Sequence, residues 1–500
     1  MFTKKQLLVF WLLLAFQAIF LLAFVFLRYV DADEGLYLEM AYLVKTGKLP
    51  YLDFFYNQMP YLPYAYSLIS DSGFSSLFFG RLISAGASLL LGLLLFWFAY
   101  KSSRDAKISL LVFFLYGYHG LTLTWHSTVK TSTFSDLWGF VSSIFFISYL
   151  TAEKERAKNL MLFFSGIFMG LALNFRLTHT ILLLTASLLI FLLPPVENIR
   201  KRICNFVSLL FGVILSSSFA IYLFLRDPHI FIFDNLIFRQ IWGHQVIKMN
   251  LMNRLFTLSK FLFYPQDLLI LILASLSLVG LVGQLKKGYK ISLENRVTIV
   301  FLSYAFSIIL LSLVISPTQF QYFAQALPFL LIACIPALRK LRSKWENKKI
   351  VVPSGALYLL SIIPFVMIFI FGIRERDQQF TLKNLKKVVE VIQKNSQPKE
   401  RVLAFTPLYI VLSGREPVPG LEAWGGEVAP LLTKKQMRDC KLIDVEETKA
   451  MIQEAKVNLI VAEEWVLPLS DPMDPNSDSS LWSKYRLLEK IGGVQIYKKK

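Results

Sequence analysis

Charged side chains make up only 17% of this 500-residue sequence, whereas 55% of its residues are apolar. Soluble proteins carry about 25% charged and about 45–50% apolar residues. This shortage of charge excludes a water-soluble enzyme, a disordered chain and a coiled-coil or collagen-like fibre. The charges lie in short runs between long apolar stretches, which is typical of a polytopic membrane protein.

Cysteine is scarce too, and the common catalytic motifs are missing. The three cysteines (Cys204, Cys334 and Cys440) are scattered, which excludes a disulfide framework and a paired CxxC metal site. There is no GxxxxGK[ST], HExxH or GxSxG motif, so a nucleotide-binding phosphate loop is not expected. No His and carboxylate cluster has metal-ligand spacing, and we predict no required cofactor, with a divalent metal near Asp33 left as an alternative.

Eleven apolar runs are long enough to predict membrane-spanning helices, which need about 20 residues each. The first begins after Lys4 and Lys5 and lacks a small-residue cleavage site, so we interpret it as a retained span. The predicted spans are 6–27, 82–100, 108–124, 134–151, 160–175, 178–193, 204–225, 267–284, 297–315, 321–338 and 351–373.

The net charge of +19 would suggest nucleic acid as a partner of a soluble protein, but here it follows the loops. One alternating set of loops carries 21 Lys and Arg residues and the other only 10. Because basic loops stay cytoplasmic, we predict a multi-pass plasma or inner-membrane protein with a cytoplasmic amino terminus and no nucleic-acid partner. Loops 28–80 and 226–266 would then lie outside, and 59–71 would be an interfacial or re-entrant helix.

The sequence predicts two domains, a helical transmembrane domain over 1–373 and an extracytoplasmic α/β domain over 374–500. The tail has amphipathic helical stretches at 382–395 and 444–456. Short apolar runs at 401–405, 458–462 and 493–497 read as strands. This alternation is the basis for the α/β prediction.

The first outer loop opens with an acidic helix. Asp31 and Glu34 have the spacing of a capping box, and Gly47 is suited to end the helix. Asp33 shares the apolar stripe of Leu36 and Met40. Acids in a first turn commonly cap the helix and offset its dipole, and for Asp31 we favour that role. A carboxylate on a buried stripe costs desolvation unless it is used, so Asp33 is a candidate functional residue.

These residues carry a resemblance to a known family. The run Asp33-Glu34-x-x-Tyr37, then Gly47-x-x-Pro50-Tyr51-x-Asp53, and then Pro60 resembles the first outer loop of polyprenyl-phosphate-sugar-dependent glycosyltransferases. These enzymes have the C-type glycosyltransferase fold and include glycosyltransferase family 39, the protein O-mannosyltransferases and the aminoarabinose transferase of lipid A. Further similar segments follow in order, at Arg81, 174–178, 234–236 and 321–328.

The resemblance implies a transferase that moves a sugar from a polyprenyl-phosphate donor to a hydroxyl of an envelope glycan, lipid or protein. Asp33 would be the general base, with Glu34 as the second candidate, and attack opposite the phosphate would invert the anomeric centre. Substrate binding is predicted for a set of polar residues from both outer loops: Tyr37, Asp53, Gln58, Arg81, Arg176, Arg239, His244 and Lys248.

The chain departs from the family at one point. Many relatives have His-Lys-Pro-Pro where this sequence has Asn57-Gln58-Met59-Pro60, so the lysine that could contact the donor phosphate is absent. Another cation must serve. Arg176, at a helix end, would bind phosphate or anchor the interface, and Arg81 is favoured as an anchor. The loop that contains His126 and Lys130 is predicted to be solvated.

Two other functions remain as alternatives. A transporter or lipid-linked sugar flippase would also have many spans, but ion-coupled transporters usually bury acids near the bilayer midplane. Here Asp136 and Asp267 lie near the outer ends of their spans. The third hypothesis is a non-catalytic assembly factor whose outer domain binds a partner.

Overall fold

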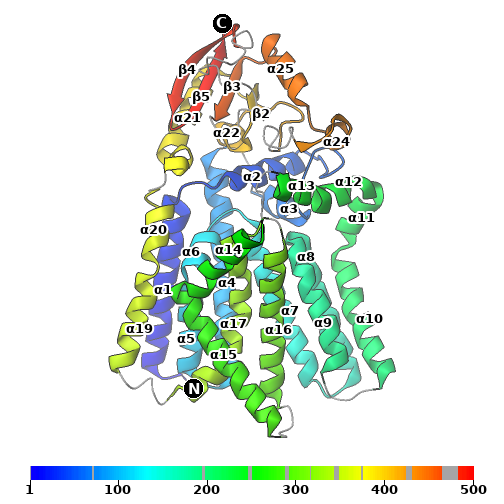
Figure 1. Ribbon diagram of the computed structural model, residues 1–500, viewed down its shortest axis with the longest axis vertical. Coiled ribbons are helices and arrows are strands. Elements are labelled where there is room, and N and C mark those ends of the chain that lie inside the picture. Colours follow the sequence, from blue (N-terminus) through cyan, green and yellow to red (C-terminus); the bar gives the residue numbers. More distant parts are fainter. Residues whose placement is uncertain are drawn as a thin grey trace.

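The computed structural model describes residues 2–69, 73–193, 198–245, 250–287, 292–315, 317–342, 348–372, 375–423, 431–463 and 482–500. The side chains of residues 244, 245, 348–352 and 375–377 are not described. Figure 1 shows a bundle of helices with a smaller domain at one end, and the carboxyl terminus lies in that domain.

The bundle is built from helices, most of which run roughly along its long axis (Figure 1). They are α1 (Lys4–Leu27), α4 (Phe74–Ser103), α5 (Ala106–Gly117), α6 (Gly120–Trp125), α7 (Thr131–Thr151), α8 (Glu155–Phe175), α9 (Thr180–Leu192), α10 (Ile199–Ser216), α11 (Ser218–Arg226), α15 (Pro265–Lys286), α16 (Leu293–Val314), α17 (Leu327–Ala333), α18 (Ile335–Lys340), α19 (Lys348–Leu360) and α20 (Ile363–Phe369).

Each predicted span coincides with a helix or with consecutive helices, although several are interrupted. Among the described residues, six helices are long and apolar enough to cross a membrane, and α10 with α11 makes a seventh that bends by 66°. Four other apolar segments have only 10–17 residues. Large apolar side chains such as Trp11, Phe211 and Val279 are exposed on the bundle, as contact with lipid requires. The number of crossings and their direction stay predictions.

Short helices close the end of the bundle that faces the small domain. Helices α2 (Ala32–Lys45) and α3 (Tyr61–Ser67) come from the first predicted outer loop. The second contributes α12 (Pro228–Ile232), the π-helical turn η2 (Phe233–Ile237), α13 (Phe238–Gln245) and α14 (Leu251–Phe263). The predicted capping box of α2 is confirmed, and Gly47 follows the helix with a φ of 91°. Figure 1 shows α2 and α3 between the bundle and the small domain.

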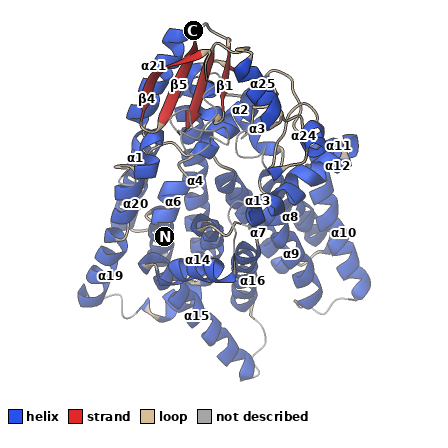
Figure 2. Ribbon diagram, turned by 45° about the horizontal axis from the view of Figure 1, so that its top comes forward, coloured by secondary structure: helices blue, strands red, loops and turns tan. Residues whose placement is uncertain are grey.

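The carboxyl-terminal domain is a five-stranded mixed sheet with helices, as predicted (Figure 2). The strand order is β2-β1-β3-β5-β4, with β1 parallel to β2 and β3, and β5 antiparallel to β3 and β4. Its elements are α21 (Leu382–Asn395), β1 (Arg401–Ala404), α22 (Pro407–Ser413), β2 (Glu416–Pro417), α24 (Lys434–Asp439), α25 (Val445–Gln453), β3 (Leu459–Glu463), β4 (Tyr485–Ile491) and β5 (Val494–Lys499).

Close packing joins this domain to the helix that carries Asp33. Gly35 of α2 lies directly against α22, because a Cβ atom at Gly35 would stand 2.4 Å from the Cα of Leu408. Only glycine allows two backbones to approach so closely. The small domain therefore holds α2 from above while the bundle holds it from below.

Candidate active site

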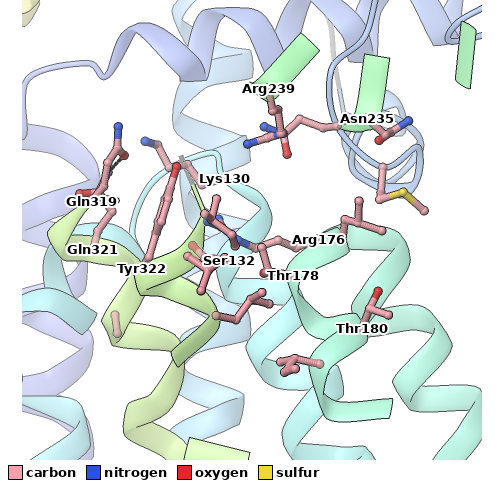
Figure 3. Close-up of a pocket in the computed structure, with 18 of the residues that line it drawn as sticks. Lys130, Ser132, Arg176, Thr178, Thr180, Asn235, Arg239, Gln319, Gln321 and Tyr322 are labelled. Atoms are coloured by element: carbon pink, nitrogen blue, oxygen red, sulfur yellow. Dashed lines mark hydrogen bonds between the residues drawn. The ribbon is translucent and has the colours of Figure 1, made fainter. Parts of the chain in front are cut away.

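A cavity of about 900 Å³ lies beneath α2, at the end of the bundle next to the small domain. Chain segments that are far apart in sequence form its wall. They include Asp33 and Tyr37 of α2, Trp125 to Ser132, Arg176 to Ile181, Asn235 to Gln240, and Gln319 to Ala324. Figure 3 shows Arg239 above the cavity, with Lys130, Arg176 and Tyr322 below it.

Among the described residues that line this cavity, Asp33 is the one carboxylate. Its Oδ2 accepts a hydrogen bond from Lys130 Nζ at 3.0 Å, and the same Nζ lies 3.1 Å from Asp31 Oδ1. The Asp33 side chain is 44% exposed, whereas that of Lys130 is 10% exposed and packs over the Trp125 ring. A carboxylate that is open to the cavity can accept a proton.

The charges around Lys130 stabilise one another. Burial alone would lower the pKa of Lys130, but the carboxylates of Asp31 and Asp33 outweigh burial and raise it. Burial would raise the pKa of Asp31, but Lys130 and Arg28 outweigh it and lower that pKa. Lys130 and Asp31 are therefore both charged at neutral pH. The prediction of a solvated loop was wrong, because His126 and Lys130 are both buried.

Glu34 occupies a different environment from its neighbour. It is fully buried and does not line the cavity. Arg81 donates to both of its oxygens, from Nε at 2.8 Å and from Nη2 at 2.7 Å, and Arg28 Nη1 lies 3.5 Å away. The backbone N–H of Val129 also donates to Glu34, at 3.0 Å. Glu34 thus ties the start of α2 to the segment that carries Lys130.

Arg81, a predicted substrate-binding residue and anchor, is also placed away from the cavity. It is fully buried, and besides Glu34 it donates to the backbone carbonyls of Val25, Arg28 and Tyr29. These hydrogen bonds occupy its guanidinium within the protein, so the geometry supports a structural role at the junction of α1, α2 and α4.

Arg176 and Arg239, two of the predicted substrate-binding residues, line the cavity. Arg176 Nη1 donates to Thr131 Oγ1 at 3.3 Å, and its guanidinium lies over the Tyr322 ring. Arg239 donates from Nε and Nη2 to the carbonyl of Asn57. Within the described ranges neither arginine forms an ion pair with a carboxylate, so their charges are available to an anion.

The other predicted binding residues divide into three groups. Tyr37 and Gln58 line the cavity, and burial raises the pKa of the Tyr37 hydroxyl. Asp53 is exposed and lies outside the cavity, where its carboxylate accepts from the backbone N–H of Leu49 at 2.7 Å. The side chain of His244 and the whole of Lys248 lie outside the described residues.

Further residues complete the wall, some of them from the family-like segment 321–328 and one, Arg254, from the outer-loop cations that the sequence offers for the donor phosphate. Gln319, Gln321 and Tyr322 come from the 3₁₀ turn η3 (Phe320–Ala326). Arg254 also lines the cavity, but it donates to the carbonyls of Val314 and Ile315 at the end of α16. In the sequence, the polar side chains at the start of the predicted span 321–338 are the pattern that indicates this part of the wall. Among the described residues, no group of three or more His, Cys, Asp or Glu could hold a metal ion.

Comparisons by sequence find no matching family model and no matching curated protein. Comparisons by structure do find similar folds. ArnT from Cupriavidus metallidurans in the apo state superposes with a TM-score of 0.64 at 11% identity, over 97% of each chain. The same protein bound to undecaprenyl phosphate gives 0.65 at 12% identity, again over 97% of each chain.

A third solved structure is more distant. The Archaeoglobus fulgidus oligosaccharyltransferase, in complex with zinc and sulfate, has a TM-score of 0.50 at 11% identity and covers 90% of this chain and 68% of its own. At these identities the likeness is one of fold. The chain is an integral membrane protein with the C-type glycosyltransferase fold, as its resemblance in sequence predicted.

Proposed function

We propose that this protein transfers a sugar from a polyprenyl-phosphate donor to a hydroxyl of an envelope acceptor at the outer surface of the membrane. The observation that carries the proposal is the cavity beneath α2. It combines the carboxylate of Asp33 with two arginines that form no ion pair with a carboxylate within the described residues. The similar fold of an ArnT structure bound to undecaprenyl phosphate supports a lipid phosphate as the ligand.

In the proposed reaction, Asp33 accepts the proton of the acceptor hydroxyl as its oxygen attacks the anomeric carbon. The bond between that carbon and the phosphate oxygen breaks, and the lipid phosphate leaves with one more negative charge. Arg176 and Arg239 would stabilise this charge. The two arginines would thus take the place of the family lysine, which is glutamine at position 58 of this sequence. A positioned general base contributes about 10²–10⁴-fold to such a reaction.

The geometry favours Asp33 over Glu34 as the base. Glu34 accepts two hydrogen bonds from Arg81 and is out of reach of the cavity. Asp33 has a side chain partly open to the cavity and a single cation beside it. Attack by a base on the face opposite the phosphate would invert the anomeric centre.

The proposed sidedness follows from the loops. The basic loops predict a cytoplasmic amino terminus, and the cavity then faces outward together with the domain at 374–500. In a variant whose three native cysteines are replaced, cysteines placed at residues 105 and 450 would be labelled from opposite sides of the membrane. Labelling from one side would overturn this arrangement.

The function is tested by mass spectrometry of envelope glycans from cells that lack the gene. The wild-type gene should restore a sugar that the Asp33→Asn variant does not, with both proteins equally abundant in the membrane. Asp444→Asn is a matched control. Asp444 also lies at the start of a helix, α25, and its Oδ2 is 3.9 Å from Lys434 Nζ, but it belongs to the small domain and does not line the cavity. A normal glycan with Asp33→Asn would refute the mechanism.

A further inference from the structure

Directly behind the cavity, one buried carboxylate contacts two histidines from different segments. Asp136 of α7 is fully buried. Its Oδ2 lies 3.2 Å from His126 Nε2 and its Oδ1 lies 3.2 Å from His179 Nε2. His126 ends α6 and lines the cavity, and His179 belongs to the 3₁₀ turn η1 (Leu177–His179).

The chemistry of the three side chains fixes how they are connected. An ionised carboxylate only accepts hydrogen bonds, so each Nε2 must carry the proton that it directs at Asp136. The remaining nitrogen of His126, Nδ1, lies 3.2 Å from the hydroxyl of Tyr116, which in turn lies 3.1 Å from Ser88 Oγ. A desolvated carboxylate is stable only when its partners are in place, so both histidines must be seated together.

Each histidine belongs to a segment that also carries a cavity cation. Lys130 is four residues after His126 in the same buried segment. Arg176 is three residues before His179, and its carbonyl accepts the backbone N–H of His179 at 3.0 Å. Among the described residues, one hydrogen bond joins the two segments, from Arg176 Nη1 to Thr131 Oγ1 at 3.3 Å, and the rings of Phe134 and Phe175 stack nearby. Such a long bond fixes their separation poorly.

We infer that Asp136, His126 and His179 form a clamp that sets the spacing between Lys130 and Arg176. Asp136 is thus a positioning residue, and this role rests on the proposed function. The clamp keeps Lys130, and with it the proton acceptor Asp33, at a fixed distance from Arg176, which binds the phosphate. A misplacement of about 1 Å in such a site can cost about 10²-fold in rate.

A second buried pair provides a matched control. His119 Nε2 lies 3.1 Å from Asp267 Oδ1, and both side chains are fully buried, but neither lines the cavity. Substitution of Asp267 removes the same kind of contact from the same bundle, at the far end of α6 from His126 and away from the cavity. Asp136→Asn and Asp267→Asn can therefore be compared directly.

The test measures undecaprenyl phosphate binding and sugar transfer by the purified full-length chain. Asp136→Asn should weaken binding about tenfold and slow transfer about 10²-fold, while Asp267→Asn leaves both near the wild-type values. Unfolding temperatures of the two variants show whether they are equally folded. If Asp136→Asn binds and transfers like the wild type, or if Asp267→Asn loses as much, the clamp is refuted.

Substitution of His179 keeps the proposal testable where Asp136→Asn fails to fold. Glutamine keeps an N–H donor for Asp136, so His179→Gln should retain most of the binding that His179→Ala loses; equal loss in both would overturn the clamp. Arg176→Ala separates this proposal from the proposed function. If Arg176→Ala binds undecaprenyl phosphate normally, the proposed function fails and the clamp fails with it. If only Arg176→Ala loses binding and the clamp variants do not, the clamp alone is refuted.

Discussion

Replacement of Glu34 by glutamine removes the negative charge from a site in which Arg28 and Arg81 are fully buried. The Arg81 guanidinium would lose a two-pronged ion pair at 2.7–2.8 Å. Loss of one partner from a buried ion pair costs about 3–5 kcal/mol, because the other charge stays buried without compensation. We therefore expect Glu34→Gln to lower the unfolding temperature of the purified protein and its yield.

Two substitutions on the same helix serve as comparisons. Burial and the nearby Glu422 raise the pKa of Glu39 to about 8, so Glu39 is already largely protonated at pH 7 and Glu39→Gln should cost little. Asp33→Asn should also leave the unfolding temperature nearly unchanged, because partly exposed ion pairs contribute only about 0–1 kcal/mol. If Glu34→Gln is as stable as Glu39→Gln and yet abolishes transfer, Glu34 has a direct part in the chemistry and our assignment is wrong.

Two further predictions concern the contact between α2 and the small domain. Gly35→Ala should loosen the domain and make it sensitive to protease, because its Cβ would overlap Leu408; the control Gly86→Ala has no atom within 4 Å of the new Cβ, and equal sensitivity in both would contradict the packing argument. The second concerns pH. The pKa of Glu39 is raised from 4.5 to about 8, so the folded state binds the extra proton and stability falls as the pH rises from about 4.5 to about 8. The unfolding temperature of the wild type should be lower at pH 8 than at pH 5, and this difference should be smaller in Glu39→Gln. An equal difference in both proteins would refute the role of Glu39.

The sequence predicted what depends on local pattern. The capping box of α2, the amphipathic helix at 382–395 and the strand near 401–405 follow from short-range spacing, and all three are present. Strand β4 was not predicted, because only three of its seven residues, Leu487, Leu488 and Ile491, are aliphatic and most of its side chains are not buried. Its place is set by pairing with β5, which a local pattern does not reveal.

The candidate site was predicted in part for the same reason. Asp33, Arg176 and Arg239 could be selected one by one as polar residues near helix ends. The partners could not, since Lys130 is 97 residues from Asp33 and Glu34 meets Arg81 across 47 residues. Only the packing of α2 against α4 and the 125–132 segment shows that Glu34 is enclosed while Asp33 faces the cavity.

The most direct test of the central claim measures binding and transfer on the same purified protein. Undecaprenyl phosphate is titrated into wild type, Asp33→Asn and Arg176→Ala, and sugar transfer to envelope acceptors is measured in parallel. We predict that Asp33→Asn binds the lipid like the wild type but transfers about 10²–10⁴-fold more slowly, whereas Arg176→Ala loses binding. Transfer at the wild-type rate by Asp33→Asn would contradict the account.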